Sequence, residues 1–225
     1  MEYKYEIHCH TKNVSKCGQI DVRELIKIYK QQGYNGIVLT DHFSPMTFGL
    51  KEHFSRKKAV DKYLTSYRIA KEYEDESFSV LLGVELRFYA TINDYLIYGV
   101  TEEDLYNAPH LLLCYLKRAY KYFHKRGCIV IQAHPFRKFM HPVNPEYLDG
   151  AEVHNGKDGE EERNKANAWA DTFPHKAIKT GGSDFHRESQ MKNLCGIITK
   201  EPVKTNDDLV RILKNGEYTL LQNSN

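Results

Sequence analysis

The sequence predicts an α/β fold with a mainly parallel sheet, and three observations support this fold class. Short apolar runs alternate along the chain with amphipathic stretches of helical spacing, as they do in repeated strand–helix units. The chain has 225 residues, of which 41% are hydrophobic, so one domain over residues 1–225 can bury a sizeable core. The number of strand–helix units favours a barrel over an open sheet.

In the first half of the chain, apolar patterning marks strands and helices in turn. Tyr3–His8 alternates polar and apolar residues, which is typical of a strand. Asp21–Gln32 carries apolar residues at helical spacing, with Asp21 as a candidate N-cap and Gly33 as a stop. The same patterns predict strands at Gly36–Thr40 and Phe78–Val84 and a helix at Lys58–Glu74.

The second half continues the alternation without an internal repeat or a long linker. We expect strands at Tyr95–Tyr98, Cys128–Ile131, Ala151–His154, Ala177–Thr180 and Gly196–Thr199. Helices are expected at Leu111–Arg126, Gly159–Ala170 and Asn206–Leu213. The first of these helices is followed by Gly127, a common helix terminator.

Composition excludes several classes of protein. A net charge of +2 argues against nucleic-acid binding driven by bulk charge. The five cysteines form no CxxC pair, which argues against a disulfide framework and a zinc ribbon. No apolar run is long enough to cross a bilayer, and the first residues, MEYKYEIHCH, do not resemble a secretory signal. We therefore expect a cytoplasmic protein without a membrane partner.

The unusual feature of the composition is its 11 histidines, and several of them follow the predicted strands. Polar residues at strand ends are His8 and His10, Asp41 and His42, Glu85, His134, and Asp184 and His186. In a parallel barrel the carboxyl ends of all strands share one face, where active sites lie. Five histidines and three carboxylates are thus expected to converge on one mouth.

These residue types suit a site for transition metals. Imidazole and carboxylate ligands together bind Zn, Mn or Fe. His8 and His10 point to the same side of a strand because side chains alternate with period two, and Asp184 and His186 repeat that spacing. Glu85 has two oxygens that can bridge two ions. Each motif alone is common by chance, so the prediction depends on their joint order along the chain.

Taken together, five motifs resemble those of the polymerase and histidinol phosphatase (PHP) superfamily. They are His8-Cys9-His10-Thr11, Leu39-Thr40-Asp41-His42, Gly83-Val84-Glu85, Ala133-His134-Pro135 and Gly182-Ser183-Asp184-Phe185-His186. The resemblance spans nearly the whole chain. It implies a distorted (β/α)7 barrel, similar to a TIM barrel, that binds two or three divalent ions (Zn, Mn or Fe). The resemblance also implies that the protein hydrolyses phosphoesters with metal-activated water.

The resemblance also implies a ligand set. One ion takes His8, His10, Glu85 and Asp184; a second shares Glu85 and takes His134; a third takes His42 and His186. The chain departs from the fullest family pattern at two positions. Cys17 is either a thiolate ligand of the third ion or an ordinary thiol, and Asp94 is either a ligand of the second ion or a turn residue.

Roles in catalysis and substrate binding are predicted from the positions of residues beside the expected ligands at the barrel mouth. Asp41 is a candidate for orienting a ligand or for assisting proton transfer, and Asp184 is expected to be essential for turnover. His186 and His134 are both candidates for the leaving-group acid. Arg137 and then Arg87 are the preferred phosphate contacts, and His154 is either a substrate contact or a wall residue.

The expected function is hydrolysis of a small phosphorylated metabolite or nucleotide, as in a histidinol-phosphatase-like phosphoesterase. Two alternatives remain: a nuclease acting on DNA or RNA ends, and a catalytically silent PHP fold that binds metal or a partner. The sequence shows no basic stripe with interleaved aromatic residues, which argues against the nuclease. The nearly complete set of convergent polar groups argues against a silent scaffold.

Overall fold

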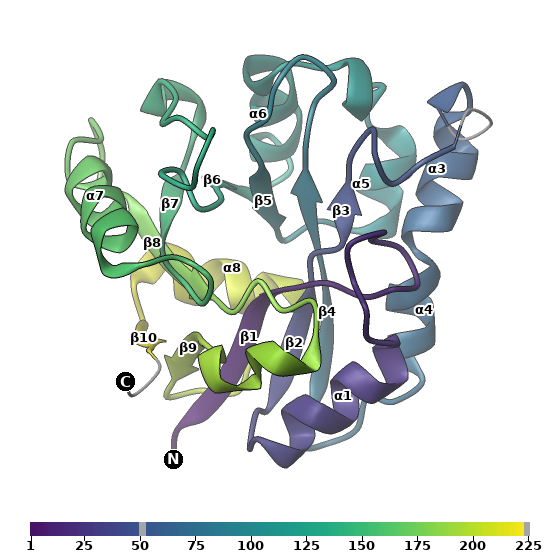
Figure 1. The fold of residues 1–225 in the computed structure, drawn as a ribbon, viewed down its shortest axis with the longest axis vertical. Coiled ribbons are helices and arrows are strands. Elements are labelled where there is room, and N and C mark those ends of the chain that lie inside the picture. The colour runs from purple at the N-terminus through teal and green to yellow at the C-terminus, as the bar shows by residue number, and fades with distance from the viewer. Residues whose placement is uncertain (50–52, 223–225) are drawn as a thin grey trace.

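The strands form one curved sheet that closes almost completely into a barrel, as predicted (Figure 1). The computed structural model describes residues 1–49 and 53–222. Along the sheet the order is β10-β9-β1-β2-β4-β5-β6-β7-β8, and β3 pairs with β4. The sheet curls until β8 lies beside β1. There Cys9 and Phe185 form an isolated parallel bridge, in which the backbone NH of His10 donates to the carbonyl of Phe185 at 3.0 Å.

The strands that carry the predicted site run parallel, with exceptions elsewhere in the sheet. The strands are β1 (Tyr3–Cys9), β2 (Gly36–Leu39), β3 (His42–Phe43), β4 (Ser79–Leu86), β5 (Tyr95–Tyr98), β6 (Ile129–Gln132), β7 (Gly150–Asn155), β8 (Ile178–Gly182), β9 (Gly196–Thr199) and β10 (Tyr218–Leu221). Parallel ladders join β1 to β2, β2 to β4, β6 to β7 and β7 to β8. β5 and β9 are antiparallel to their neighbours. For β5 the reason is its short connection to β4, which leaves no room for a crossover helix.

Helices cover the outside of the barrel, with α1, α3 and α4 on one side and α7 on the opposite side (Figure 1). They are α1 (Val22–Gln31), α3 (Arg56–Tyr63), α4 (Thr65–Lys71), α5 (Glu102–Asn107), α6 (Leu116–His124), α7 (Glu160–Ala170) and α8 (Asn206–Asn215). Asp21 caps α1 as predicted, accepting from the backbone NH of Arg23 at 3.1 Å. The single helix expected at Lys58–Glu74 is instead two, α3 and α4, which meet at Leu64.

The expected helix Leu111–Arg126 is shorter than predicted. Leu111–Leu113 forms a separate 3₁₀ turn, and α6 starts only at Leu116. Leu111 and Leu112 are buried in the core together with Phe123 of α6, so tertiary packing takes these leucines out of the helix. Within the described residues, no helix is both long enough and apolar enough to cross a bilayer.

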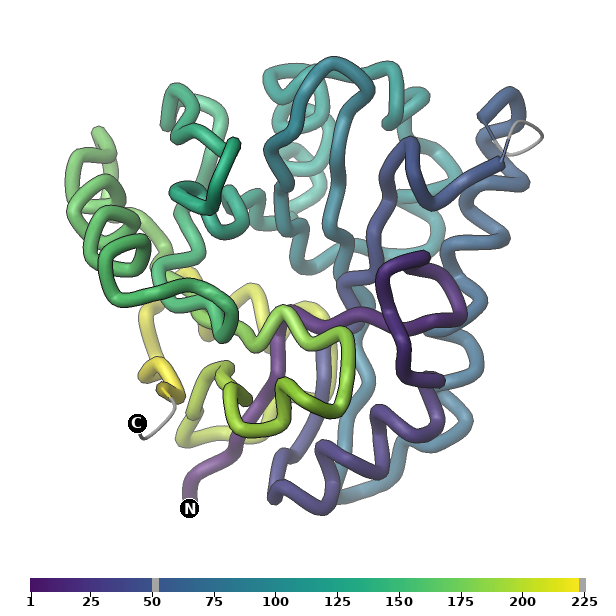
Figure 2. Tube along the Cα trace, viewed as in Figure 1, coloured from purple at the N-terminus to yellow at the C-terminus, as the bar shows by residue number. Residues whose placement is uncertain are grey.

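The chain path brings together segments that are distant in sequence. Figure 2 shows the turn after β1, near residue 15, close to the segment that follows β8, near residue 185. Hydrogen bonds join these segments, since the backbone NH of Gln19 donates to the carbonyl of His186 at 2.8 Å. One end of the barrel is therefore surrounded by the carboxyl ends of β1, β6, β7 and β8 and by the last residues of β4.

Candidate metal centre

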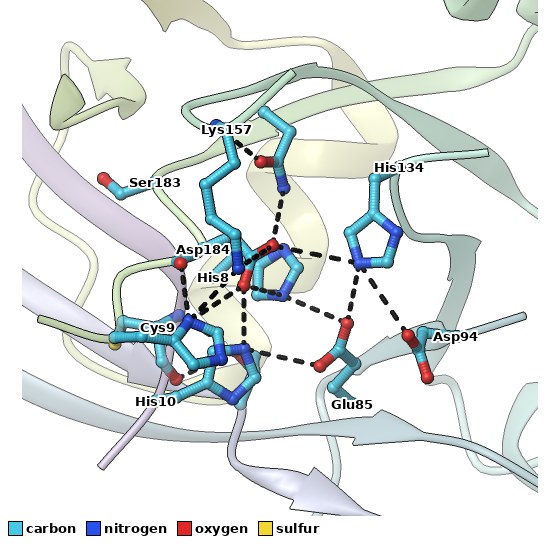
Figure 3. Close-up of polar contacts among 12 residues, drawn as sticks. His8, Cys9, His10, Glu85, Asp94, His134, Lys157, Ser183 and Asp184 are labelled. Carbon is cyan, nitrogen blue, oxygen red and sulfur yellow. Dashed lines mark hydrogen bonds and ion pairs between the residues drawn. The ribbon is translucent and has the colours of Figure 1, made fainter. Parts of the chain in front are cut away.

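Glu85, at the end of β4, lies at the centre of the convergent histidines (Figure 3). Its Oε1 is 3.3 Å from Nε2 of His8 and 3.0 Å from Nε2 of His134. Its Oε2 is 3.4 Å from Nε2 of His10 and 2.6 Å from Nδ1 of His42. The side chain of Glu85 is completely buried. One carboxylate thus faces four imidazoles that come from three different segments of the chain.

Asp184 supplies a second carboxylate to the same cluster. Its Oδ1 lies 3.3 Å from Nε2 of His10 and 3.3 Å from Nδ1 of His186, and its Oδ2 lies 4.0 Å from Nε2 of His134. Asp184 and His134 both adopt positive φ angles, 50° and 26°. Residues other than glycine rarely adopt this conformation, and such strain concentrates at functional sites. The backbone is therefore strained at two residues that aim side chains into the cluster.

The atoms that face one another here fit a cation. His8 Nε2, His10 Nε2, His42 Nδ1 and Glu85 Oε2 are buried, and none makes a hydrogen bond within the described part of the chain. Buried polar atoms without partners cost free energy, so these four atoms indicate that the cluster is built to bind a ligand. The groups with ligand atoms within 4.8 Å of one another are His8–His10–Glu85, His8–His134–Asp184, His42–Glu85–Asp94 and His10–His42–His186.

The opposite nitrogens of the imidazoles hold the rings in place. Nδ1 of His8 lies 2.7 Å from Oε1 of Glu152, and Nδ1 of His186 lies 2.8 Å from the backbone carbonyl of Asp184. Nδ1 of His10 faces Oγ of Ser15 at 3.4 Å. A proton on the outward nitrogen leaves the inward nitrogen with its lone pair, as metal-binding histidines require.

Burial and charge set the protonation of these rings. Burial, together with the neighbouring His186 and His42, holds the pKa of His10 well below its ordinary value, so His10 is neutral at pH 7. Burial also opposes a charge on His8, but the carboxylates of Glu152, Asp184 and Glu85 raise the pKa of His8 well above its ordinary value. The carboxylates at the centre thus attract positive charge strongly enough to outweigh burial.

The family model of the PHP domain matches residues 6–218 of the chain. The chain belongs to the PHP family. None of the curated proteins compared with it matches.

Solved structures share the PHP fold at low sequence identity. A two-domain protein from Bacteroides vulgatus, described as containing a predicted PHP-like metal-dependent phosphoesterase, aligns over 99% of this chain with a TM-score of 0.73 and 16% identity. PsfC from Pseudomonas syringae aligns over 93% of this chain and 88% of its own, with a TM-score of 0.67 and 16% identity. The lesion-specific endonuclease PfuEndoQ from Pyrococcus furiosus aligns over 98% of this chain, with a TM-score of 0.60 and 13% identity. The PHP chain spans 65% of the Bacteroides protein and 58% of the endonuclease.

Asp41 lies beside the PHP centre rather than facing it. Its two oxygens accept hydrogen bonds from the backbone NH of Thr11 (2.7 Å) and from the hydroxyls of Thr11 (2.8 Å), Ser15 (2.7 Å) and Ser66 (2.6 Å). Ser15 in turn contacts Nδ1 of His10 and accepts from the backbone NH of His42 at 2.9 Å. This arrangement favours an orienting role for Asp41, because protein donors already occupy both oxygens.

The two positions that depart from the fullest family pattern both lie at the centre. Sγ of Cys17 is 3.1 Å from Nε2 of His186. Burial opposes ionisation, but hydrogen bonds to His186 and His42 lower the pKa of Cys17 to about 6. Oδ2 of Asp94 lies 3.9 Å from Nε2 of His134, and Arg87 binds both oxygens of Asp94, at 2.7 and 2.5 Å. The guanidinium of Arg87 is therefore paired with the carboxylate of Asp94.

The other two predicted substrate contacts lie in different surroundings. Arg137, after β6, reaches Asp184, with Nη1 2.7 Å from Oδ2. His154 makes no hydrogen bond or ion pair to the described residues of the centre. Burial and the positive charge of Arg163 on α7 lower the pKa of His154 to about 4. The register of β7 on β8 shifts between Glu152 and His154, so simple alternation does not extend to His154.

Sequence reasoning missed two residues that contact the centre, Glu152 and Lys157. Oε1 of Glu152 contacts His8, and its Oε2 accepts from the backbone NH of His134 at 3.0 Å. Nζ of Lys157 lies 3.0 Å from Oδ2 of Asp184. Glu152 could have been found, because a carboxylate inside a predicted buried strand is costly without a partner. No sequence pattern distinguishes Lys157 from other loop lysines.

Replacing Glu152 with glutamine is expected to weaken metal binding by about 10- to 100-fold, the usual effect of losing a partner that orients a ligand. The variant removes the negative charge that fixes the proton on Nδ1 of His8. Competition with a chelator would measure the affinity. Exposed Glu161 offers a matched control as Glu161→Gln. Unchanged affinity in Glu152→Gln would show that Glu152 does not support the centre.

Proposed function

We propose that this PHP protein is a metal-dependent phosphoesterase that hydrolyses a small phosphorylated metabolite or nucleotide. The observation that carries the proposal is that Oε2 of Glu85 and the facing nitrogens of His8, His10 and His42 are buried and have no hydrogen-bond partner among the described residues. The small net charge of +2 favours a small substrate over a long nucleic acid.

We assign the ligands as follows. His8, His10, Glu85 and Asp184 would hold one ion; Glu85, His134 and Asp94 a second; and His42, His186 and Cys17 a third. The close group His8–His10–Glu85 supports the first ion. The second is supported by Nε2 of His134, which lies 3.0 Å from Oε1 of Glu85 and 3.9 Å from Oδ2 of Asp94, and the third by the contact between Cys17 and His186. Imidazole, carboxylate and thiolate together suit Zn, Mn or Fe.

Each residue around the centre then has a chemical task. Bound divalent ions would supply the Lewis acidity needed for water to attack phosphorus. Arg137 would supply a fixed positive charge beside the phosphate, because Asp184, Asp158 and Asn155 hold its guanidinium in place. Asp41 positions His10 and His42 through Ser15. His134 and His186 remain the two candidates for protonating the leaving oxygen.

Within this function we favour a histidinol-phosphatase-like monoesterase. We propose that the chain acts as one domain and that it is located in the cytoplasm. Thiols at Cys9, Cys17, Cys114 and Cys128 fit a reducing compartment. A nuclease is the alternative within the same chemistry.

Metal analysis and three substrates test the proposal. Purified protein would be assayed with Mn or Zn on p-nitrophenyl phosphate, on bis(p-nitrophenyl) phosphate and on a 3′-tailed oligonucleotide. We expect two or three ions per chain and the highest kcat/KM on the monoester. Preference for the oligonucleotide would favour the nuclease, and substoichiometric metal with no hydrolysis would refute an enzyme.

The variants Asp184→Ala and His134→Ala are expected to abolish turnover while the fold is retained. Both remove side chains that aim into the centre. Since alanine tolerates positive φ poorly, Asp184→Asn provides a second variant, because asparagine adopts this conformation more readily. Activity assays with circular dichroism would test this, with the exposed residue His175 as the control, His175→Ala. Substantial turnover in Asp184→Asn would contradict the assignment.

A further inference from the structure

Lys157 lies in a turn that the barrel holds tightly. The turn follows β7, and the backbone NH of Gly156 donates to the carbonyl of Gly182 on β8 at 2.9 Å. A Cβ at Gly156 would come within 2.4 Å of the carbonyl oxygen of Asn193, so only glycine allows this approach. Oδ1 of Asn155 accepts from the backbone NH of Lys157 at 2.9 Å. This turn fixes the point from which the Lys157 side chain extends toward Asp184 (Figure 3).

The two carboxylate oxygens of Asp184 contact different groups. Oδ1 faces the imidazoles of His10 and His186, each at 3.3 Å. Oδ2 receives two cations, Nη1 of Arg137 at 2.7 Å and Nζ of Lys157 at 3.0 Å. Two positive groups that meet on one oxygen lie close enough together to bind two oxygens of a single phosphate.

The two cations are held differently. Other side chains hold the guanidinium of Arg137, with Oδ1 of Asp158 at 2.9 Å and Oδ1 of Asn155 at 2.8 Å from Nη2. Among the described residues, the ammonium of Lys157 contacts only Asp184 and, at 3.4 Å, Nδ1 of His186. The Lys157 side chain is 29% exposed. Arg137 is therefore a fixed cation, whereas Lys157 can exchange its carboxylate contact for an incoming anion.

We propose that Lys157 binds the phosphate of the substrate directly and, with Arg137, selects phosphomonoesters over phosphodiesters. This inference rests on the proposed phosphoesterase function. At neutral pH a monoester carries almost two negative charges on three terminal oxygens, whereas a diester carries one charge on two. The ammonium of Lys157 thus pairs with the second negative charge, which only the phosphate of a monoester carries.

The test compares Lys157→Ala and Lys157→Arg with the wild type, all loaded with Mn. We expect Lys157→Ala to lower kcat/KM for p-nitrophenyl phosphate by about 10- to 100-fold, the range for one lost hydrogen bond to a charged group. The value for bis(p-nitrophenyl) phosphate should change by less than about threefold. Lys157→Arg should recover part of the monoester activity. The matched control is Lys138→Ala, an equal loss of charge on an exposed lysine after β6.

Binding of inorganic phosphate, measured by calorimetry on the Mn-loaded protein, separates this inference from the proposed function. We expect Lys157→Ala to weaken phosphate binding by about 10-fold or more, with metal content unchanged. If the wild type bound metal and phosphate but hydrolysed neither ester, phosphoesterase activity would be refuted while the role of Lys157 in binding stood. Unchanged phosphate affinity, an equal loss on both esters, or loss of metal in Lys157→Ala would overturn the inference.

Discussion

Replacing Glu85 with glutamine is expected to lower metal-dependent turnover of p-nitrophenyl phosphate by more than about 100-fold. This exceeds the roughly 10- to 100-fold loss that is usual when only a partner that orients a ligand is removed. Glutamine keeps the shape of the side chain but removes the charge that faces His8, His10, His42 and His134 at 2.6–3.4 Å. Its amide also replaces one acceptor oxygen with a donor. Steady-state kinetics with metal analysis on the same samples would measure the effect.

The control for Glu85→Gln is Glu72→Gln, the same change at an exposed residue after α4. The melting temperature without metal should fall in Glu85→Gln. Burial opposes the charge of Glu85, but His42, His8 and His10 outweigh it and hold the pKa of Glu85 well below its ordinary value, so this charge stabilises the fold. A variant that bound the full complement of metal and retained wild-type turnover would show that Glu85 does not organise the centre.

The barrel and the centre of its site could be predicted because both depend on local patterns. Apolar runs located β1, β2 and β4 to within a few residues, and a histidine or carboxylate after each run marked the common face. Parallel strands force these ends together whatever the details of packing. The structure accordingly brings His8, His10 and Glu85 within 4.8 Å of one another.

Other features depend on long-range contacts that no local pattern reports. Lys157 reaches Asp184 only because β7 and β8 are neighbours and Gly156 packs against the segment after β8. The sequence places His154 on the shared face because it ends the run from Ala151, as a substrate contact or a wall residue, but what surrounds it, including Arg163 on α7, depends on tertiary packing. The antiparallel direction of β5 follows from a short connection, which the run Tyr95–Tyr98 does not reveal by itself.

Removing the divalent metal is expected to lower the thermal midpoint by about 8–16 °C for each ion held at 1,000 times its dissociation constant. Such binding stabilises the native state by about 4 kcal/mol, and a domain of this size loses roughly 2–4 °C per kcal/mol. Without metal, Glu85 and Asp184 stay buried beside imidazole nitrogens that have no hydrogen-bond partner among the described residues. Scanning calorimetry after chelation, and again after Mn or Zn is restored, would measure the shift.

The same experiment on Glu85→Gln separates metal binding from a general effect of salt. If Glu85 joins two ions, its loss should abolish most of the metal-dependent shift, because both ions lose a shared anionic ligand. An exposed substitution such as Glu72→Gln should leave the whole shift in place. Equal shifts in both variants would mean that the stabilising ions bind elsewhere, and the convergence of histidines on Glu85 would then need another explanation.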